Sequence, residues 1–402
     1  MRFDDTSIGG PAQQFPSTVW SRLQAAGDPS HPEYRRGLDH LLTSYWKPAF
    51  TYIRMAPGEY PGGIGFWNLS GEPDRPIVIA AADPRNPPVI KGGKTGLYFS
   101  NPSHVEVRDL VITGASVYGL HIDDGGSKAG SPPRHLLLRG LRVSDTGTDG
   151  NHDALKLSGL EDFRVEGCTL ERWGRGEGID MVGCHGGTIE GNVLRHDGRT
   201  VVTGVQMKGG TSRMVVRRNR FEQIGGRGIN VGGCTGLQFF RPPLTTPPFS
   251  EAREILVEGN SFIGGIVPFA FPGTDGATVR FNTIYCPKRW ALRILQETSA
   301  DGFVPSRNGV LTDNLFVFRS EEWNGGGVDI GDGTDPKSFR FERNWWYCLN
   351  DPAKTKRLVR LPTQEIDGVY GRDPLLRDPE KGDLTLRPDS PAGAAGSQAL
   401  PR

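Results

Sequence analysis

The sequence lacks the features that mark membrane, zinc-binding and disulfide-rich proteins. No run of apolar residues is long enough to cross a bilayer. There are only five cysteines in 402 residues and no CxxC pair, which argues against a zinc site and against a full set of disulfides. Lysine and arginine (47) balance aspartate and glutamate (46), so charge gives no support to a nucleic-acid partner. We therefore expect buried free thiols, no membrane and no nucleic acid.

The first residues also lack the pattern of a secretory signal. MRFDDTSIGG has acidic residues where such a signal has a basic region followed by an apolar one. Taken as written, the sequence predicts a cytoplasmic protein, although the family that it resembles below is usually secreted or periplasmic.

A short motif repeats along the chain: an alternating apolar strand, one polar residue and a second short strand. With 56 Gly and 31 Pro, the sequence also has the residues needed for many tight turns. The repeat length of roughly 22 to 30 residues predicts one coil of a solenoid. Asparagines stacked from coil to coil form a hydrogen-bonded ladder. The predicted ladder is Asn192, Asn219, Asn260, Asn282, Asn314 and Asn344, with Cys168, Leu141 and Leu110 in the same place in earlier coils.

Each coil contains a further strand, usually entered through Gly, in which two apolar residues flank one central residue. Successive side chains of a strand point to opposite faces, so the central residue should point outward. The predicted exposed column is His121, Lys156, Asp180, Gln206, Asn230, Ala270, Arg293 and Asp329. Parallel columns hold Asp123, Ser158 and Lys208 on one side, and Tyr118, Asp153, Glu177, Thr203, Arg227 and Trp290 on the other.

These repeats predict an all-β fold, a right-handed parallel β-helix over residues 55–402. They resemble the pectin-lyase-like superfamily of β-helix proteins over about residues 51–395. The resemblance implies a carbohydrate-active protein, an enzyme on balance, with a polysaccharide as its partner. We expect a monomer whose segment from about residue 350, with its paired Asp-Pro turns, caps the C-terminal end.

The N-terminal segment, residues 1–54, differs from the rest. Apolar residues in 15–54 recur at helical spacing, and Ser17 or Thr18 could cap the helix. FPSTVWS, AAGD and YWKPAFTYIR resemble the opening of region 2 in extracytoplasmic-function sigma factors, but no promoter-reading part follows Arg54. We expect a short helical segment that caps the solenoid rather than a transcription factor.

An elongated polar face suits a polysaccharide, and the first chemistry that fits is β-elimination on a uronic acid polymer. Lys208, in QMKGG, is the candidate base, with Lys156 as a neighbouring cation that favours its neutral form. QMKGG resembles the lysine strand of β-helix alginate and chondroitin lyases, in which Ser-Gly follows the lysine. Their arginine one coil further on is replaced here by Gly232, so Arg227 or Arg293 would have to supply that charge.

The second chemistry is hydrolysis by paired carboxylates. NHDALKL and GEGIDM resemble two strands of polygalacturonases, which implies Asp153 and Glu177 as the carboxylates, with Asp180 beside them. The Gly-His-Gly and Arg-Ile-Lys motifs of that family are absent. His152 could act as a base or orient Asp153.

A third interpretation is a glycan-binding solenoid without catalysis. On any of the three, the candidate substrate-binding residues are His121, His152, Gln206, Arg227, Asn230, Phe240, Arg241 and Arg293. Phe240 and Arg241 belong to a long loop that could wall a cleft beside the polar face. Asp123 and Asp124 offer the hard oxygen ligands that Ca²⁺ prefers, so calcium is a candidate cofactor. We favour the lyase, because QMKGG places a lysine among polar neighbours on the outer face.

Overall fold

The computed structural model describes residues 52–126, 131–147 and 150–400. Most of the predicted N-terminal helix, with its sigma-factor-like words, lies outside these residues. Its last three residues, 52–54, belong instead to a strand, β1 (Tyr52–Met55), so the helix prediction is wrong there. The described chain divides into two compact units, the first ending at Gly174 and the second beginning at Arg175.

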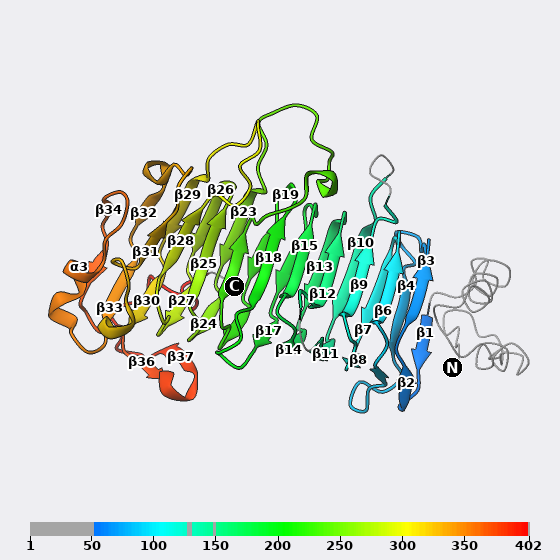
Figure 1. Ribbon diagram of the computed structural model, residues 1–402. Helices are drawn as coiled ribbons and strands as arrows, with labels where there is room; N and C mark the ends of the chain where they lie inside the picture. The colour runs from blue at the N-terminus through cyan, green and yellow to red at the C-terminus, as the bar shows by residue number, and fades with distance from the viewer. Residues whose placement is uncertain (1–51, 127–130, 148–149, 401–402) are drawn as a thin grey trace, which may run out of the picture. The chain divides into compact units, whose positions relative to one another are not determined.

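The first unit is built from parallel strands in three sheets, which we call A, B and C (Figure 1). Sheet A has the order β1, β4 (Ile77–Ala81), β7 (Val105–Arg108), β10 (Arg134–Arg139), β13 (Glu161–Glu166). Sheet B has the order β2 (Glu59–Pro61), β5 (Val89–Lys91), β8 (Val111–Thr113), β11 (Arg142–Thr146), β14 (Thr169–Trp173). Sheet C has the order β3 (Ile64–Trp67), β6 (Thr95–Ser100), β9 (Tyr118–Asp123), β12 (Asp153–Ser158).

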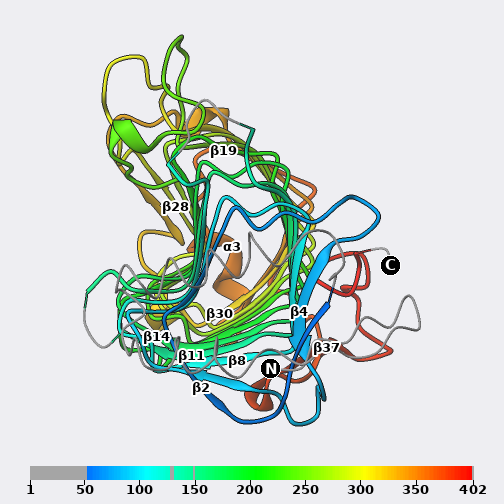
Figure 2. The same cartoon turned by 90° about the vertical axis from the view of Figure 1, so that its right-hand side faces the viewer.

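The second unit repeats this pattern, and in both units strands of successive coils stack in parallel (Figure 2). Sheet A continues as β16 (Thr188–Glu190), β20 (Val215–Arg217), β23 (Ala252–Glu258), β26 (Thr274–Arg280), β29 (Arg307–Thr312), β32 (Arg340–Glu342), β34 (Glu365–Ile366), with β19 (Thr211–Ser212) beside β23. Sheet B continues as β17 (Val193–Arg195), β21 (Arg220–Glu222), β24 (Ser261–Ile263), β27 (Thr283–Tyr285), β30 (Leu315–Phe318), β33 (Trp345–Cys348), β35 (Val369–Tyr370). Sheet C continues as β15 (Glu177–Val182), β18 (Thr203–Lys208), β22 (Arg227–Val231), β25 (Val267–Pro272), β28 (Leu292–Leu295), β31 (Val328–Ile330). The predicted all-β parallel β-helix is confirmed.

Helical structure in the described residues is confined to single turns. Five are 3₁₀ turns: η1 (Leu237–Phe239), η2 (Ser320–Glu322), η3 (Pro336–Ser338), η4 (Pro352–Lys354) and η5 (Pro379–Lys381). One is a short α-helix, α3 (Thr355–Leu358). No helix among the described residues is long and apolar enough to span a membrane.

The predicted asparagine ladder runs through the second unit. Each side-chain amide donates to the Oδ1 of the asparagine in the next coil, at 2.9 to 3.0 Å. The last member, Asn344, donates to Glu365 Oε1 at 2.8 Å. All six asparagines are buried, so each coil is locked to the next by amides shielded from water.

The predicted columns of sheet C are confirmed in register. Gln206 pairs with Asp180 and Asn230, and Ala270 pairs with Asn230 and Arg293. The flanking apolar residues, such as Val205 and Met207, are fully buried. The prediction that the column is exposed is wrong in its middle, where Asp180, Gln206, Asn230 and Ala270 are buried. Neighbouring polar side chains cover one another there.

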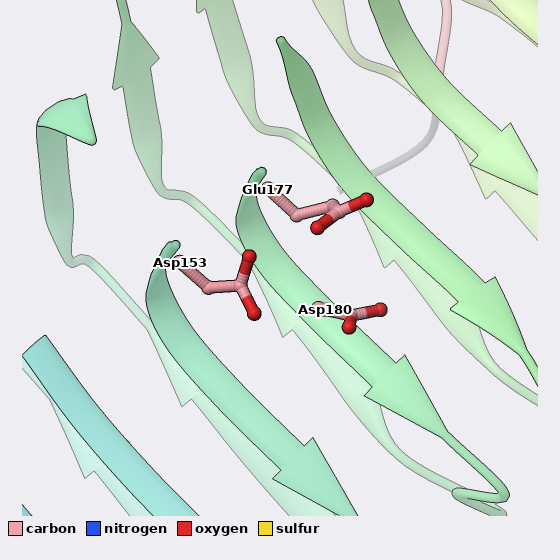
Figure 3. Close-up of side chains that lie close together, drawn as sticks. All are labelled: Asp153, Glu177 and Asp180. Carbon is pink, nitrogen blue, oxygen red and sulfur yellow. The ribbon is translucent and has the colours of Figure 1, made fainter. Parts of the chain in front are cut away.

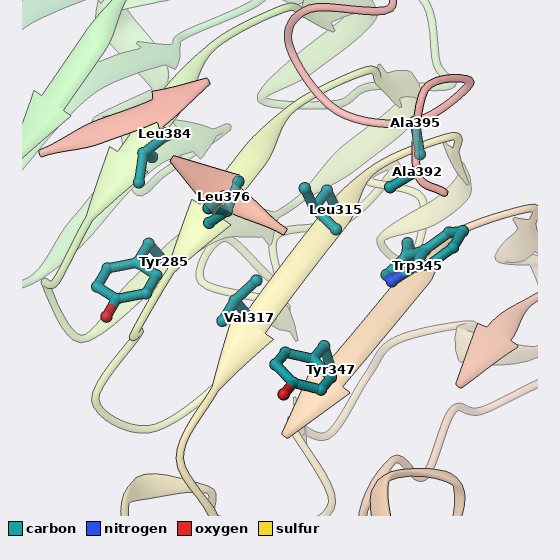
Figure 4. Packing of buried hydrophobic residues seen from close by; sticks show 9 residues of the cluster. All are labelled: Tyr285, Leu315, Val317, Trp345, Tyr347, Leu376, Leu384, Ala392 and Ala395. Atoms are coloured by element: carbon teal, nitrogen blue, oxygen red, sulfur yellow. The ribbon is translucent and has the colours of Figure 1, made fainter. Parts of the chain in front are cut away.

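The C-terminal segment forms an antiparallel hairpin, β36 (Leu376–Asp378) with β37 (Asp383–Leu386). Leu376 and Leu384 of this hairpin, with Ala392 and Ala395, pack on side chains of β27, β30 and β33 in sheet B (Figure 4). The hairpin therefore covers part of the outer face of that sheet. Of the five cysteines, three are buried and Cys286 is half-buried, but Cys234 is exposed, which corrects the prediction of buried thiols.

Candidate active site

The centre of the candidate site in the second unit is a pair of buried carboxylates on β15. Glu177 and Asp180 each present an oxygen, and these oxygens lie within 4.8 Å of one another (Figure 3). Gln206, on the next strand, donates from Nε2 to Glu177 Oε1 at 2.9 Å and to Asp180 Oδ1 at 3.4 Å. One amide group therefore contacts both acids and fixes their separation.

The hydrogen-bond chain continues onto the next strand, β22. Asn230 Nδ2 donates to Gln206 Oε1 at 2.7 Å, and Arg227 Nη1 donates to Asn230 Oδ1 at 3.1 Å. The same guanidinium forms an ion pair with Glu297, which follows β28. Each amide thus has its nitrogen toward the acids and its oxygen toward the cation. A chain of this polarity is rigid and costly to break, since every buried partner would lose a hydrogen bond.

Lys208 is the last residue of β18, and its Nζ lies 3.4 Å from Asp180 Oδ1. Its side chain is 13% exposed, whereas that of Asp180 is 0% exposed. The amine is therefore held by a buried carboxylate but can be reached from solvent. The predicted base and one of the predicted acids are brought together by the fold.

Arg241 reaches the same end of β18 from the long loop between β22 and β23. Its backbone N–H donates to Gly209 O at 3.1 Å, one residue after Lys208. Its side chain passes over Gly183, where an added Cβ would lie only 2.3 Å from Arg241 Cβ. Gly183 in turn donates to Lys208 O at 2.9 Å. The loop thus places the backbone and Cβ of Arg241 beside the turn after Lys208, and the Nη1 of Arg241 donates to Phe239 O at 3.1 Å.

The aromatic residues of this loop differ from the prediction. Phe240 is 1% exposed and packs edge-on against Phe303, with ring centroids 5.4 Å apart. It fastens the loop and cannot contact a substrate. Phe239 is 54% exposed and is the ring that faces solvent. Of these two neighbouring rings, one is therefore packed inside the protein and the other is exposed to solvent.

A buried glutamate that the sequence did not single out anchors this loop. Glu251 is 0% exposed. Its two carboxylate oxygens accept from Gly209 N at 2.7 Å, Thr235 N at 2.9 Å and Thr235 Oγ1 at 2.7 Å, and from Thr298 Oγ1 at 2.5 Å. One carboxylate therefore ties the turn after Lys208 to both flanking loops. Its partners are scattered along the sequence without periodicity, so no sequence pattern predicts these contacts.

The two arginines expected to replace the missing family arginine lie elsewhere on the face. Arg227 is in register with Thr203, at the opposite end of β18 from Lys208. Five residues of strand, roughly 16 Å, separate these positions along the strand. Arg293 lies two strands beyond Asn230 and binds Asp329 Oδ2 from Nε at 2.7 Å. Of these three arginines, Arg241 is the one whose backbone is hydrogen-bonded to the turn that follows Lys208.

In the first unit, the predicted residues on β12 form their own pair. Asp153 is 1% exposed, and Lys156 Nζ lies 3.9 Å from its Oδ2. Asp153 points outward from the start of β12 (Figure 3), in register with Tyr118 of β9. His152 packs over Gly147, where an added Cβ would meet its ring at 2.5 Å.

His121 and the predicted calcium ligands form a hydrogen-bonded group on β9. Asp123 accepts from Tyr98 Oη at 2.9 Å and Ser100 Oγ at 3.0 Å, and His121 Nε2 lies 3.7 Å from its Oδ2. Burial lowers the pKa of His121, partly opposed by Asp123. Asp123 and Asp124 also accept from the backbone N–H groups of residues 125 and 126. Among the described residues, neither aspartate belongs to a group of three side chains that lie close enough together to hold a metal ion.

Two of three comparisons with known proteins find matches to this fold. The family model described as "Right handed beta helix region" matches residues 89–240, in keeping with the predicted handedness. No curated protein matches the chain significantly. A GH136 lacto-N-biosidase from Eubacterium ramulus matches with a TM-score of 0.50 at 11% identity, covering 84% of this chain and 70% of that protein.

Two lyases of similar structure match less closely. An alginate lyase from Paenibacillus sp. str. FPU-7 has a TM-score of 0.48 and 16% identity, covering 73% of this chain and 96% of its own. The pectate lyase Pel9A has a TM-score of 0.47 and 14% identity, covering 74% and 72%. At these identities the likeness concerns the fold, and the chemistry has to be argued from the site.

Proposed function

We propose that this protein is a carbohydrate-active enzyme that cleaves an acidic polysaccharide by β-elimination, with Lys208 as the base. The observation that carries the proposal is the contact between Lys208 Nζ and buried Asp180 at 3.4 Å, on the outer face of a long parallel sheet. A lysine acts as a general base through its neutral amine, and Lys208 stands at the end of β18 with its side chain 13% exposed.

The reaction needs a base, a cation that binds the sugar carboxylate and a proton for the departing oxygen, and the proposal assigns residues to the first two. The neutral amine of Lys208 takes the proton from the carbon next to the sugar carboxylate. The electron pair of that C–H bond forms a double bond to the neighbouring carbon, whose bond to the glycosidic oxygen breaks. The departing oxygen takes up a proton from solvent. Asp180, whose Oδ1 lies 3.4 Å from Nζ, faces the positive charge that forms on Lys208.

The substrate carboxylate must be neutralised before the neighbouring proton becomes acidic. In the proposal Arg241 binds it, because the Cβ and Cγ of this residue lie over Gly183, whose N–H donates to Lys208 O. Arginine suits the task, since its planar fork pairs with both oxygens of a carboxylate. The loop that carries Arg241 is fixed by Glu251, so the cation is positioned before the substrate arrives.

Calcium fits as a second source of positive charge. Glu177 and Asp180 offer oxygen ligands within 4.8 Å of each other, and hard oxygen donors suit Ca²⁺. A cation held there would add charge beside the bound carboxylate. We place a calcium site at these two residues in preference to Asp123 and Asp124, neither of which belongs to a cluster of candidate metal ligands in the described part of the chain.

The direct test is incubation with a panel of alginate, polygalacturonate, chondroitin and neutral polysaccharides. β-Elimination leaves an unsaturated sugar that absorbs ultraviolet light, and that absorbance is the expected result on an acidic polymer. New reducing ends without the absorbance would show hydrolysis, for which Asp153 and Glu177 are the candidate acids. Binding without either product would leave a glycan-binding solenoid.

A further inference from the structure

A second polar cluster on sheet C lies apart from Lys208 and is not used by the proposed chemistry. Trp290, two residues before β28, has the guanidinium of Arg289 at 4.5 Å and that of Arg293 at 4.9 Å from its ring centroid. Both distances are within the range of cation–π attraction, which holds a guanidinium over an indole. Two cations are therefore fixed around a single aromatic ring.

The backbone of this cluster is also held. Arg289 N donates to Ile266 O at 3.2 Å, and Arg289 O accepts from Asn324 N at 2.9 Å. Trp290 N donates to the same Ile266 oxygen at 3.4 Å. A cation presented from a backbone fixed on both sides loses little freedom when a ligand binds it.

The charges of the cluster are only partly neutralised. Arg293 Nε donates to Asp329 Oδ2 at 2.7 Å, which leaves the terminal nitrogens of that guanidinium for another acceptor. Arg289 is exposed and forms no ion pair with a carboxylate in the described part of the chain. Lys288, the next residue back, is exposed as well. The cluster therefore presents excess positive charge to solvent.

The register of sheet C sets the distance between this cluster and the candidate base. Gln206 of β18 is aligned with Asn230, Ala270 and Arg293 on the three following strands. Three strand spacings amount to roughly 14 Å, the length of about three sugar residues. Lys208 lies two residues further along its strand than Gln206, so an extended polymer bound at Lys208 reaches Arg293 by running obliquely across the strands, toward the ends at which they begin.

We propose that Arg289, Trp290 and Arg293 form a distal subsite for an anionic group of the polysaccharide, a carboxylate or a sulfate. The proposal rests on the proposed function for the class of polymer, and it adds a binding site separate from the reacting residues. Each guanidinium held by the indole has a planar fork of donors that suits an anion. Asp329 orients Arg293 through the hydrogen bond from its Nε.

The test measures affinity for a graded length series of acidic oligosaccharides by calorimetry, in the Lys208→Arg background so that the ligand is not consumed. With Arg289 and Arg293 intact, the affinity should rise once the oligosaccharide reaches roughly four sugar residues, the length that spans three strand spacings. Arg289→Ala and Arg293→Ala should each weaken binding of the long oligosaccharides about tenfold, as expected for a lost charge-assisted hydrogen bond, and leave the short ones unchanged.

Three controls separate the outcomes. Arg340→Ala removes an exposed arginine of sheet A and should change nothing. Neutral oligosaccharides of equal length should show no dependence on Arg289. Uronate and sulfated series compared side by side identify the anion. Equal affinity of Arg289→Ala and the parent for every long acidic ligand would overturn the proposal, as would an equal loss at all lengths.

The same data distinguish this proposal from the proposed function. Length-dependent binding that needs Arg289, together with no cleavage by the wild-type protein, would keep the subsite and reject the elimination. Cleavage of an acidic polymer without any dependence on Arg289 or Arg293 would keep the enzyme and reject the subsite.

Discussion

Lys208 and Asp180 form the contact on which the functional account depends, with 3.4 Å between Nζ and Oδ1 and the acid fully buried. The two residues come from adjacent strands of sheet C, where Val182 is in register with Lys208. Gln206 contacts Asp180 from the same strand as Lys208. The carboxylate is therefore shared between an amide that fixes it and an amine that it holds at the surface.

Lys208→Arg tests the base more sharply than deletion does. Arginine can keep the ion pair with Asp180 but stays protonated at any pH that a protein survives, so it cannot accept a proton. We expect activity to fall at least a hundredfold in both Lys208→Arg and Lys208→Ala, the loss typical of a missing general base. Initial rates on the best acidic polymer measure it, and unchanged thermal unfolding of the arginine variant shows that the fold is intact.

Arg241→Ala should raise KM and lower kcat on polymers with free carboxylates, by roughly tenfold or more in kcat/KM, because a charge-assisted pair is lost. The same variant should differ little from the wild type on a polymer whose carboxylates are methyl-esterified. Steady-state kinetics on both substrates provide the comparison. An equal loss on the esterified polymer would assign Arg241 a purely structural role.

Glu251→Ala should destabilise the second unit and loosen the loop that carries Arg241. Four hydrogen bonds end on this buried carboxylate. Each buried donor left without a partner costs about 1–3 kcal/mol, and the full sum applies only if the four losses are independent. Urea unfolding measures the free energy. Glu254→Ala, three residues further on in β23, is a matched control, because its side chain is exposed. Loss of stability equal to that of the control would contradict the role of Glu251.

Asn282→Ala interrupts the ladder at a fully buried position. It removes the acceptor of both the backbone and the side-chain N–H of Asn260, and the donor to Asn314. We expect a loss of about 2–4 kcal/mol from the unsatisfied amides and the cavity. Denaturant unfolding is the measurement, and a change below about 0.5 kcal/mol would mean that the ladder is not a stabilising element.

His121 should give the first unit a dependence of stability on pH. Burial lowers its pKa from 6.5 in the folded chain, so the unfolded chain binds more protons as the pH falls below 6.5. The contribution is fully present above pH 6.5 and is lost as the pH falls toward the lowered value. His121→Gln should reduce the difference in unfolding free energy between neutral and mildly acidic pH, and an unchanged difference would reject this assignment.

The sequence predicts the parts of the structure that repeat from coil to coil, and it does not predict the parts that do not repeat. Alternation along each strand predicts that Gln206 aligns with Asp180 and Asn230, and the structure confirms that register. Periodicity says nothing of how far a side chain reaches. Arg227 extends over Asn230 to Glu297, so residues predicted to be exposed are covered.

Loops escape sequence reasoning for a different physical reason. Phe240 packs inward and Phe239 does not, although the two are neighbours of the same type. Their difference is set by contacts such as Phe303, more than 60 residues away in the sequence numbering. Glu251 likewise acts through partners on separate loops. The wall of the candidate site is fixed by tertiary contacts that no local pattern contains.

The most direct test of the account is the ultraviolet absorbance of reaction products on acidic polysaccharides, compared between the wild-type protein and Lys208→Arg. The account predicts absorbance from an unsaturated sugar with the wild type and none above background with the variant. Absorbance that persists in Lys208→Arg, or cleavage that yields only saturated products, would contradict the assignment of Lys208 as the base of an elimination.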